Sequence, residues 1–373
     1  MKIIDVQAYY LKLPKIQART DSSQDSLIIK IETDAEITGW GEVDSCPWVI
    51  KAIIDAPMSH TLVNGLRNIL IDQNPLDTGY LWNLMYQKTL YFGRSGAVIQ
   101  AMAGIDLALW DIKGKFYQQP VWRLIGGRYR EKLRVYSSNM FQFTPEKTAD
   151  RISFAKDQGF TAAKFGWEPF GENAQTDCKY LDAMRLAAGE DFDLMLDIGC
   201  IWDSTTTIQR CKLFESYNLL WIEEPLAPDD LCGYRSVSKK ISQRLAAGEE
   251  ECTFHGFRNL IDIGGISLAQ IDLTRCGLTQ ALKIADYADS RGILVANHNF
   301  TTDLNTAASL TFLSAIPNAL VLEYCVEPSE ISRNLALEPF KQVDGFMQVP
   351  ESPGLGFEPN LNVMEKYMVK SLD

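Results

Sequence analysis

The stretch Leu194–Asp197 (LMLD) is a short apolar run that ends in a single acid. The pattern returns in Leu219–Glu223 (LLWIE) and again in Leu245–Glu249 (LAAGE), and successive acids are 26 residues apart. Short continuous apolar runs are typical of buried parallel strands. When such strands alternate with helices, eight units close into a barrel whose functional groups lie at the carboxyl ends of the strands. The sequence therefore predicts that three carboxylates meet at one face of a barrel.

These three acids, Asp197, Glu223 and Glu249, would repel one another strongly in a shared cleft. A hard divalent cation removes that repulsion, and oxygen atoms are the ligands that Mg²⁺ prefers. The alternative interpretation is that each acid caps the helix that follows it, which is a common role for Asp and Glu. The near-constant spacing favours the metal site, so we expect the three acids to bind Mg²⁺.

The composition is that of an ordinary globular enzyme, with 46% hydrophobic and 23% charged residues in a chain of 373. The formal net charge of −12 disfavours nucleic acid and anionic membranes as partners. No apolar run has the length of a membrane span. The eight cysteines are scattered without a CxxC pair, so we expect reduced thiols and a cytoplasmic protein.

The spacing of apolar residues divides the chain into regions. Three β-rich runs fill residues 1–45, and residues 46–125 carry apolar residues at helical spacing. From residue 133 onward, strand-like runs alternate with helical segments. The expected strands are residues 133–138, 161–166, 193–197, 219–223, 245–249, 268–272, 292–297 and 318–323.

These regions predict a fold of the α/β class. Residues 126–340 are expected to form a (β/α) barrel, a modified TIM barrel, preceded by an N-terminal α+β capping domain in residues 1–125. The tail, residues 341–373, is rich in Pro and Gly and is expected to fold back on the cap and complete it.

Two cap segments are candidates for shaping a site. Residues 15–25 (KIQARTDSSQD) form a polar loop that either closes over the barrel or is a simple solvated hairpin loop. We expect this loop, Tyr91–Arg94 and barrel-loop side chains to read the stereochemistry of a substrate. Of the three histidines, we expect no catalytic role for His60 and His255.

Further polar residues stand at the ends of other expected strands. Lys164 ends the second strand, Asp272 lies in QIDLTRCG, His298 in VANHNF and Glu323 in LVLEY. Together with the three acids, the GWGE sequence near residue 40 and the helix GIDLALWDIKGK, these motifs resemble the enolase superfamily and, within it, the mandelate racemase subgroup. The resemblance spans essentially the whole chain. It implies Mg²⁺-dependent abstraction of the proton next to the carboxylate of a sugar acid, and a homo-oligomer.

The same residues have roles that follow from their chemistry. Asp272 could hold the tautomer of His298 and raise its basicity; the alternative is a surface histidine with a chance acidic neighbour. Lys164 could contact a carboxylate or transfer protons, unless it extends to solvent. Glu323 could donate to the substrate carboxylate if burial keeps it protonated, unless it caps a helix.

One position departs from the subgroup. Its racemases carry a second lysine two residues after the first, on the same face of the strand, and here that position is Gly166. Two-base racemisation needs a proton donor or acceptor on each face of the carbanion, so Gly166 disfavours it.

We therefore expect proton abstraction through an enediolate, followed by loss of water, to give a 2-keto-3-deoxy acid. The alternative is a cycloisomerase that opens an anhydro-sugar acid or lactone ring after the same abstraction. A racemase or epimerase comes third. A catalytically silent binding protein that keeps the metal site is the remaining class.

Overall fold

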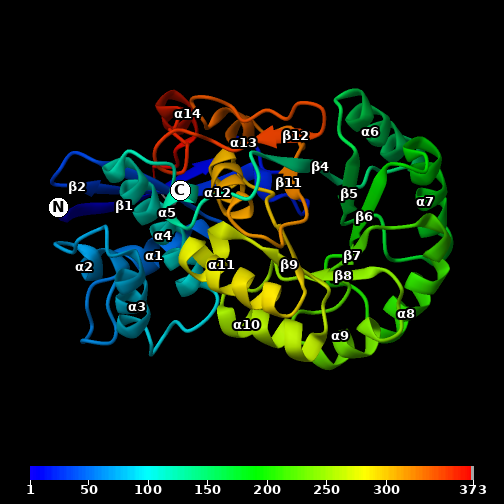
Figure 1. The fold of residues 1–373 in the computed structure, drawn as a ribbon, viewed down its shortest axis with the longest axis horizontal. Helices are drawn as coiled ribbons and strands as arrows, with labels where there is room; N and C mark the ends of the chain where they lie inside the picture. The colour runs from blue at the N-terminus through cyan, green and yellow to red at the C-terminus, as the bar shows by residue number, and fades with distance from the viewer. Residues whose placement is uncertain (371–373) are drawn as a thin grey trace.

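The chain begins with a three-stranded antiparallel sheet at one end of the molecule, shown in blue in Figure 1. The computed structural model describes residues 1–370. The three strands pair in the order β1-β2-β3 and are β1 (Ile3–Lys12), β2 (Asp25–Thr33) and β3 (Thr38–Val43). The cap helices beside the sheet are α1 (Pro47–Asp55), α2 (Leu66–Leu70), α3 (Thr78–Lys88), α4 (Ala97–Tyr117) and α5 (Val121–Leu124).

The long helix α4 lies directly against β3, and the sequence GWGE explains why. A Cβ on Gly39 would stand 2.1 Å from the carbonyl oxygen of Ala108, and one on Gly41 would stand 1.9 Å from that of Gly104. Only glycine permits this approach of strand and helix backbones.

Within residues 46–125, the first stretch with apolar residues at helical spacing (residues 49–66) does not form one continuous helix. Helix α1 ends at Asp55, and α2 begins only at Leu66. Pro57 explains the break, because proline cannot continue the helical hydrogen bonding and drives the preceding Ala56 into an extended conformation (ψ 135°).

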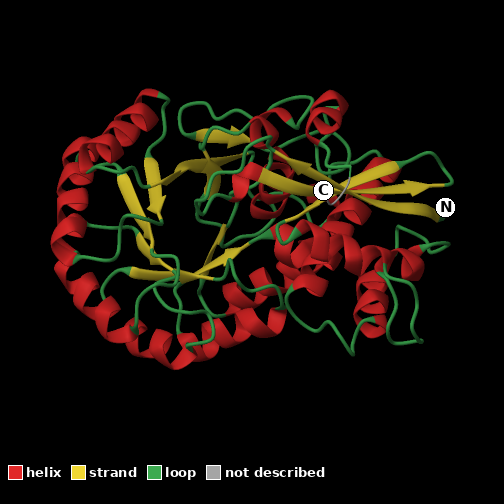
Figure 2. Cartoon of the chain, turned by 180° about the vertical axis from the view of Figure 1, so that it is seen from behind, coloured by secondary structure: helices red, strands yellow, loops and turns green. Residues whose placement is uncertain are grey.

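Eight parallel strands form a nearly closed barrel inside a ring of helices, as Figure 2 shows in yellow and red. They pair in the order β10-β9-β8-β7-β6-β5-β4-β11, and the bridge between Val295 and Ala319 joins the two ends. The strands are β4 (Lys132–Met140), β5 (Ala162–Gly166), β6 (Asp193–Asp197), β7 (Trp221–Glu223), β8 (Arg244–Ala247), β9 (Leu268–Ile271), β10 (Leu294–Asn297) and β11 (Leu322–Cys325).

The outer helices follow the strands as the alternating pattern predicts. They are α6 (Pro145–Asp157), α7 (Ala174–Ala188), α8 (Ser204–Leu213), α9 (Leu231–Ser238), α10 (Phe254–Asn259), α11 (Leu273–Ser290) and α12 (Asp303–Ser314), with short helical turns at η1 (Ser22–Gln24), η2 (Glu215–Tyr217) and η3 (Leu260–Gly264). Inside the barrel, Tyr136 and Trp221 pack edge to face with ring centroids 5.4 Å apart.

The last barrel strand differs from the expected residues 318–323. The Leu320 N–H donates to the carbonyl of Val295 in β10, and the Val295 N–H donates to the Asn318 carbonyl, whereas Leu322–Cys325 pair with β4. The segment therefore changes partner as it closes the barrel, and only its second half forms a regular ladder.

The tail contacts both parts of the molecule. Strand β12 (Phe346–Gln348) pairs antiparallel with β4. Helix α14 (Leu361–Tyr367) contacts β1 and the short helix α13 (Glu330–Asn334), which precedes the tail. On the cap side, the Leu355 N–H donates to Asp111 of α4 at 2.9 Å, and Met368 bridges Leu11 of β1. The last three residues of the predicted tail segment, 371–373, lie outside the described residues.

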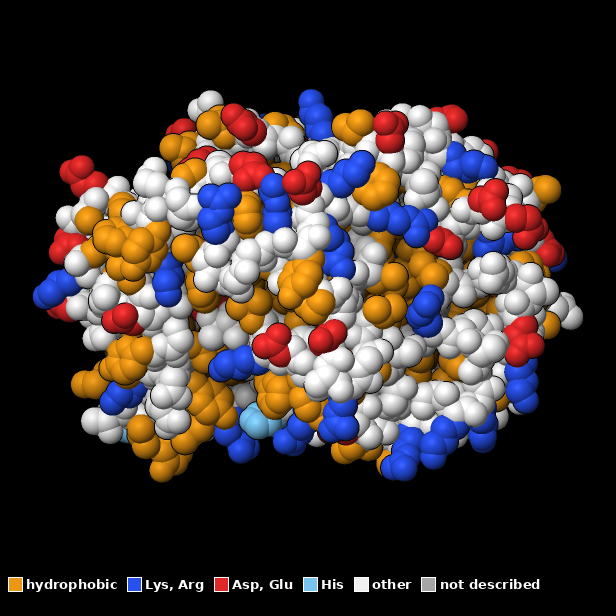
Figure 3. Space-filling view, viewed as in Figure 1, with side chains coloured by type: hydrophobic (Ala, Val, Ile, Leu, Met, Phe, Trp, Pro, Cys, Tyr) orange, Lys and Arg blue, Asp and Glu red, His pale blue; other side chains and the backbone are white. Residues whose placement is uncertain are grey.

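The surface carries both signs of charge. Figure 3 shows Lys and Arg side chains spread among Asp and Glu on one face. Among residues 1–370, no helix is both long enough and apolar enough to span a bilayer.

Candidate active site

A cavity of about 140 Å³ lies at the carboxyl ends of the barrel strands, where the cap loop meets the barrel. Most of the residues predicted to act in catalysis or metal binding surround it. Its walls are Thr20, Ser22, Ser138, Asn139, Lys164, Gly166, Trp167, Asp197, Glu249, Glu250, Arg275, His298 and Phe300.

The three acids predicted to bind metal converge here. Carboxylate oxygens of Asp197, Glu223 and Glu249 lie within 4.8 Å of one another, and all three side chains are buried. Asp197 ends β6 and Glu223 ends β7, whereas Glu249 lies two residues beyond the end of β8.

The helix-cap alternative for these acids does not hold. The helices that follow β6, β7 and β8 are capped by Asp203, Asp230 and Thr253, each through a side-chain oxygen. The three converging acids therefore satisfy no helix terminus, and another reason is needed for burying them together.

The chemistry of this cluster fits a hard cation. Burial and the charge of Glu223 raise the pKa of Asp197 to about 8, and burial with neighbouring carboxylates raises the pKa of Glu249 well above its usual range. Oε2 of Glu249 is buried and has no hydrogen-bond partner among the described residues. A divalent cation would offset the repulsion and coordinate the unpaired oxygen.

Lys164 lies between two acids rather than extending to solvent. Its Nζ contacts Oε1 of Glu223 and lies 2.8 Å from Oε1 of Glu323. Burial lowers the pKa of Lys164, but the charges of these two acids outweigh it and hold the pKa well above the ordinary value. The Trp221 indole N–H donates to the other oxygen of Glu223 at 2.8 Å.

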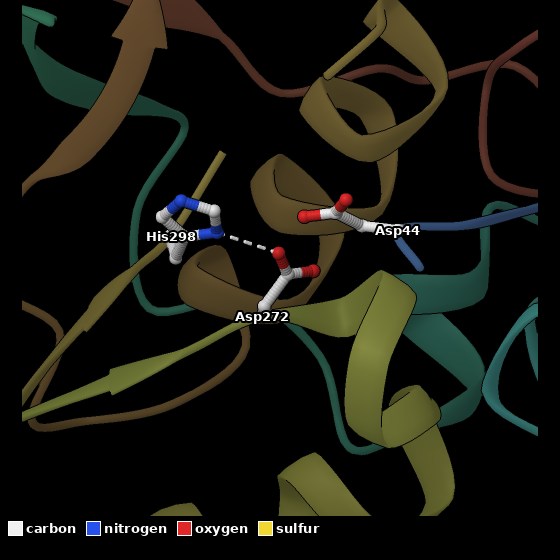
Figure 4. Close-up of side chains that lie close together, drawn as sticks. All are labelled: Asp44, Asp272 and His298. Atoms are coloured by element: carbon white, nitrogen blue, oxygen red, sulfur yellow. Dashed lines mark hydrogen bonds and ion pairs between the residues drawn. The ribbon is translucent and has the colours of Figure 1, made fainter. Parts of the chain in front are cut away.

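His298 and Asp272 form the predicted dyad, and both side chains are buried. His298 Nδ1 lies 2.7 Å from Oδ2 of Asp272, as the dashed line in Figure 4 marks. Thr274 donates its N–H and hydroxyl to the other oxygen of Asp272, which fixes the carboxylate at the start of α11. Burial lowers the pKa of His298, but the charges of Glu249 and Asp272 and the hydrogen bond with Asp272 hold it well above its usual value.

Glu323 does not have the environment expected of a protonated acid. Burial raises its pKa, but Lys164 and His298 outweigh this effect, and the pKa lies below its usual value. Its Oε2 accepts the Asn299 N–H at 2.7 Å. Glu323 is not a helix cap either, because Ser329 caps the next helix, α13. Glu323 is placed as the acidic partner of Lys164, with Oε1 2.8 Å from Nζ.

The close approach of Asp197 gives a steric reason for glycine at position 166. A Cβ at this position would lie 2.9 Å from Asp197 Cβ and 3.0 Å from its Oδ2. A lysine at position 166 would therefore displace Asp197. The indole of Trp167 occupies the space beside Gly199, where a Cβ would meet the ring at 2.6 Å.

Of the two cap segments, one reaches the cavity. Thr20 and Ser22 of the 15–25 loop line it, and the Ser22 hydroxyl donates to the Phe300 carbonyl at 3.3 Å. Arg94, in contrast, lines a separate cavity with His255, and Tyr91 packs against His60. The expectation that Tyr91–Arg94 reads the substrate has no support in this geometry.

Several wall residues were not predicted as site residues. Asn139 lies near the end of strand β4, whereas Trp167 and Phe300 come from the loops after β5 and β10, whose course the sequence does not reveal. Arg275 is the exception, because it stands one helical turn after Asp272 in QIDLTRCG and its position on that face follows from helical spacing.

The fold and the site define a barrel protein with a buried His–Asp pair and a candidate metal centre under an α+β cap. The family model "Mandelate racemase / muconate lactonizing enzyme, N-terminal domain" matches residues 3–126, and "Enolase C-terminal domain-like" matches residues 147–363. The chain belongs to the mandelate racemase/muconate lactonizing enzyme family of the enolase superfamily. Members of this superfamily bind a divalent metal.

Relatives of known activity act on sugar acids. The chain is 29% identical to D-galactarolactone cycloisomerase of Agrobacterium fabrum over 91% of this chain and 90% of the relative. It is 30% identical to D-xylonate dehydratase of Haloferax volcanii over 94% of this chain and 87% of that relative. The crystal structure of 3,6-anhydro-D-galactonate cycloisomerase from Zobellia galactanivorans superposes with a TM-score of 0.90 at 28% identity, covering 99% of this chain and 100% of that one. The chain is thus an enzyme of lyase or isomerase type.

Proposed function

We propose that this enzyme abstracts the proton α to the carboxylate of a sugar acid and then eliminates water to give a 2-keto-3-deoxy acid. Asp197, Glu223 and Glu249 are the residues that would hold Mg²⁺. The bound ion would supply positive charge that acidifies the α-proton and stabilises the resulting enediolate.

His298 is the proposed acid/base group. Asp272 fixes its orientation at 2.7 Å, leaving Nε2 as the ring nitrogen that is free to exchange a proton with a substrate. After abstraction, the same imidazolium can return the proton to the departing hydroxyl group. Lys164, paired with Glu223 and Glu323, balances negative charge in the pocket.

The observation that carries this proposal is the presence of one complete His–Asp pair and no second lysine on β5. Gly166 stands at that position, and an added Cβ there would lie 2.9 Å from Asp197 Cβ. One base suffices for elimination, whereas two-base racemisation requires a group on each face of the carbanion. Elimination is therefore favoured over racemisation or epimerisation.

Ring opening by a cycloisomerase is the second candidate. It needs the same single abstraction, with an internal oxygen as the leaving group. Two of the relatives named above are cycloisomerases, which supports keeping this activity beside dehydration.

The test is a screen of aldonates, aldarates, sugar-acid lactones and anhydro-sugar acids with Mg²⁺, scored for formation of a 2-keto acid. Mass spectrometry separates the two candidates, because dehydration gives a product lighter by one water and ring opening gives an isomer of the substrate. Exchange of the α-proton in D₂O identifies substrates that are enolised without further reaction. A complete lack of exchange with every acid would instead favour the silent binding protein.

A further inference from the structure

The cap places an acid, Asp44, beside the pair of His298 and Asp272. Proton abstraction does not require this acid. Asp44 follows β3, and its side chain is only 12% exposed. It points from the cap toward Asp272 and His298, as Figure 4 shows. Oxygen atoms of the two acids and a ring nitrogen of His298 lie within 4.8 Å of one another. Two carboxylates this close would repel without a cation between them.

Arg275 is that cation, and it joins three parts of the site. Its Nη2 and Nε donate to Oδ2 of Asp44 at 2.9 and 3.1 Å. Its Nη1 donates to the backbone carbonyl of Glu249 at 2.9 Å. Its Nε also lies 4.0 Å from Oδ2 of Asp272, which is the oxygen that pairs with His298 Nδ1.

The hydrogen bond from Arg275 to the Glu249 carbonyl matters because Glu249 lies outside strand β8 and has no strand pairing to fix its backbone. Strand β8 ends at Ala247, and Gly248 has a φ of +136°, a conformation that L side chains rarely adopt. The guanidinium of Arg275 therefore fixes a loop that carries a proposed metal ligand, while it stands beside the dyad carboxylate.

We infer that Asp44 is a positioning residue, which holds Arg275 away from Asp272 so that this acid stays paired with His298. If Asp44 is neutralised, the guanidinium loses its charged partner on the cap side. Glu250 Oε2 stays 3.4 Å from Nη1, but that side chain is 44% exposed and water screens its charge. Asp272 Oδ2, 4.0 Å from Nε, is then the nearest buried carboxylate oxygen. Arg275 then competes with the imidazole for that oxygen. Docking of the cap would thus set the geometry of the acid/base group in the barrel.

The dyad can be observed without a substrate because the chain has only three histidines. With ¹⁵N-labelled histidine and saturating Mg²⁺, the wild type should show a downfield, slowly exchanging Nδ1–H signal from His298. Asp44→Asn should shift this signal or speed its exchange and leave the signals of His60 and His255 in place. Asp44→Glu, which keeps the charge, should restore part of the wild-type signal.

Thr279→Val is the matched control. Its hydroxyl donates to Asp106 of α4 at 2.6 Å, so the variant weakens another cap–barrel contact without touching Arg275. The inference is overturned if Asp44→Asn leaves the His298 signal unmoved, or if Thr279→Val moves it equally.

Once a sugar-acid substrate is known, Asp44→Asn should lower kcat by roughly ten- to a hundredfold and change KM much less. A loss of this size is usual when a residue that orients a site group is removed. Equal effects on kcat and KM in both variants would indicate general loosening of the cap and overturn the inference. The kinetic arm rests on the proposed function, whereas the histidine signals decide the positioning role whether or not any sugar acid is turned over.

Discussion

Lys164 and His298 line the same cavity, but their partners leave them unequally able to exchange a proton. Lys164 lies between two buried acids, Glu223 and Glu323, and is held as a cation. His298 is held at one ring nitrogen by Asp272, and its other nitrogen lies 3.7 Å from Glu249. The histidine can therefore exchange a proton without breaking its orienting bond, whereas the lysine would have to leave an ion pair.

This difference predicts separable effects of two substitutions. His298→Asn should keep Mg²⁺ binding but reduce α-proton exchange in D₂O by roughly 10²–10⁴-fold, the usual size of an acid–base contribution. Lys164→Ala should weaken substrate binding and retain exchange. His255→Asn, a histidine outside the cavity, is the control and should exchange at the wild-type rate. If His298→Asn exchanges normally and Lys164→Ala does not, the lysine is the base.

Loss of a carboxylate ligand and addition of one methyl group beside it should both weaken Mg²⁺ binding. Mg²⁺ at a hundred times its Kd should stabilise the wild type by about 2.7 kcal/mol, seen as a rise in the thermal midpoint. Asp197→Asn should remove most of that rise. Gly166→Ala should do the same without changing a ligand, because the added Cβ would stand 2.9 Å from Asp197 Cβ.

Glu168→Gln is the matched control for these melting curves, since it neutralises an exposed acid near the barrel mouth. Its midpoint should respond to Mg²⁺ as the wild type does. A full Mg²⁺ response in Gly166→Ala would show that Asp197 moves freely, and the steric account of this glycine would be wrong.

At the scale of elements, strand periodicity predicts much of the site because a parallel barrel brings strand ends together. Asp197 and Glu223 end their strands as the apolar runs indicate. Glu249 lies beyond its strand, and Glu323 lies inside β11 rather than at its end. Hydrogen bonding to neighbouring strands decides where a ladder stops, and a single sequence does not display that pairing.

The 15–25 loop is the element expected to control access to the cavity. Besides the contact of Ser22 with Phe300, the Ser23 carbonyl accepts the hydroxyl of Ser329 at 2.6 Å and that of Ser332 at 3.3 Å. These bonds hold the loop against Phe300 at the cavity and against helix α13, which favours closure over the alternative of a solvated hairpin loop.

Replacing residues 19–22 by glycines should therefore raise KM and lower kcat together, because both substrate contacts and exclusion of water are lost. Steady-state kinetics with an active sugar acid measure both. The control replaces residues 34–36, at the turn between β2 and β3, by glycines. It should change neither KM nor kcat. Unchanged kinetics in the 19–22 variant would leave the loop without a role in closure.

Across the whole molecule, buried carboxylates of the cap hold the barrel. Glu42 accepts the Thr302 hydroxyl at 2.8 Å and the Asn305 N–H at 3.1 Å, and Asp106 accepts the Thr279 N–H at 2.8 Å. The sequence shows these acids within recognisable motifs, but their partners are 173 to 263 residues away. Such long-range contacts, like that of Asp44 with Arg275, follow from how the two parts dock and not from any local pattern.

These acids make the cap–barrel junction sensitive to pH. Burial raises the pKa of Glu42 from 4.5 to about 7; Ser26 and Thr302 oppose the shift, and Asp44 and Asp272 add to it. Burial also raises the pKa of Asp106 from 3.8 to about 7, against the hydrogen bonds from Thr279 and the charge of Lys283. In each case the folded protein binds the proton more tightly than the unfolded chain does.

The stabilisation from protonated Glu42 should be complete below pH 4.5 and should disappear as the pH rises through about 7. For a shift of this size, the loss is on the order of 3 kcal/mol. Glu42→Gln keeps the hydrogen-bonding shape without a titrating proton. As the pH rises from 4.5 to 7, the urea-unfolding midpoint of Glu42→Gln should therefore increase relative to that of the wild type. Other titrating groups, including the metal-site acids, are common to both proteins and cancel in this difference. A difference that stays constant across this range would show that Glu42 is ionised in the folded protein, with its charge balanced inside the junction.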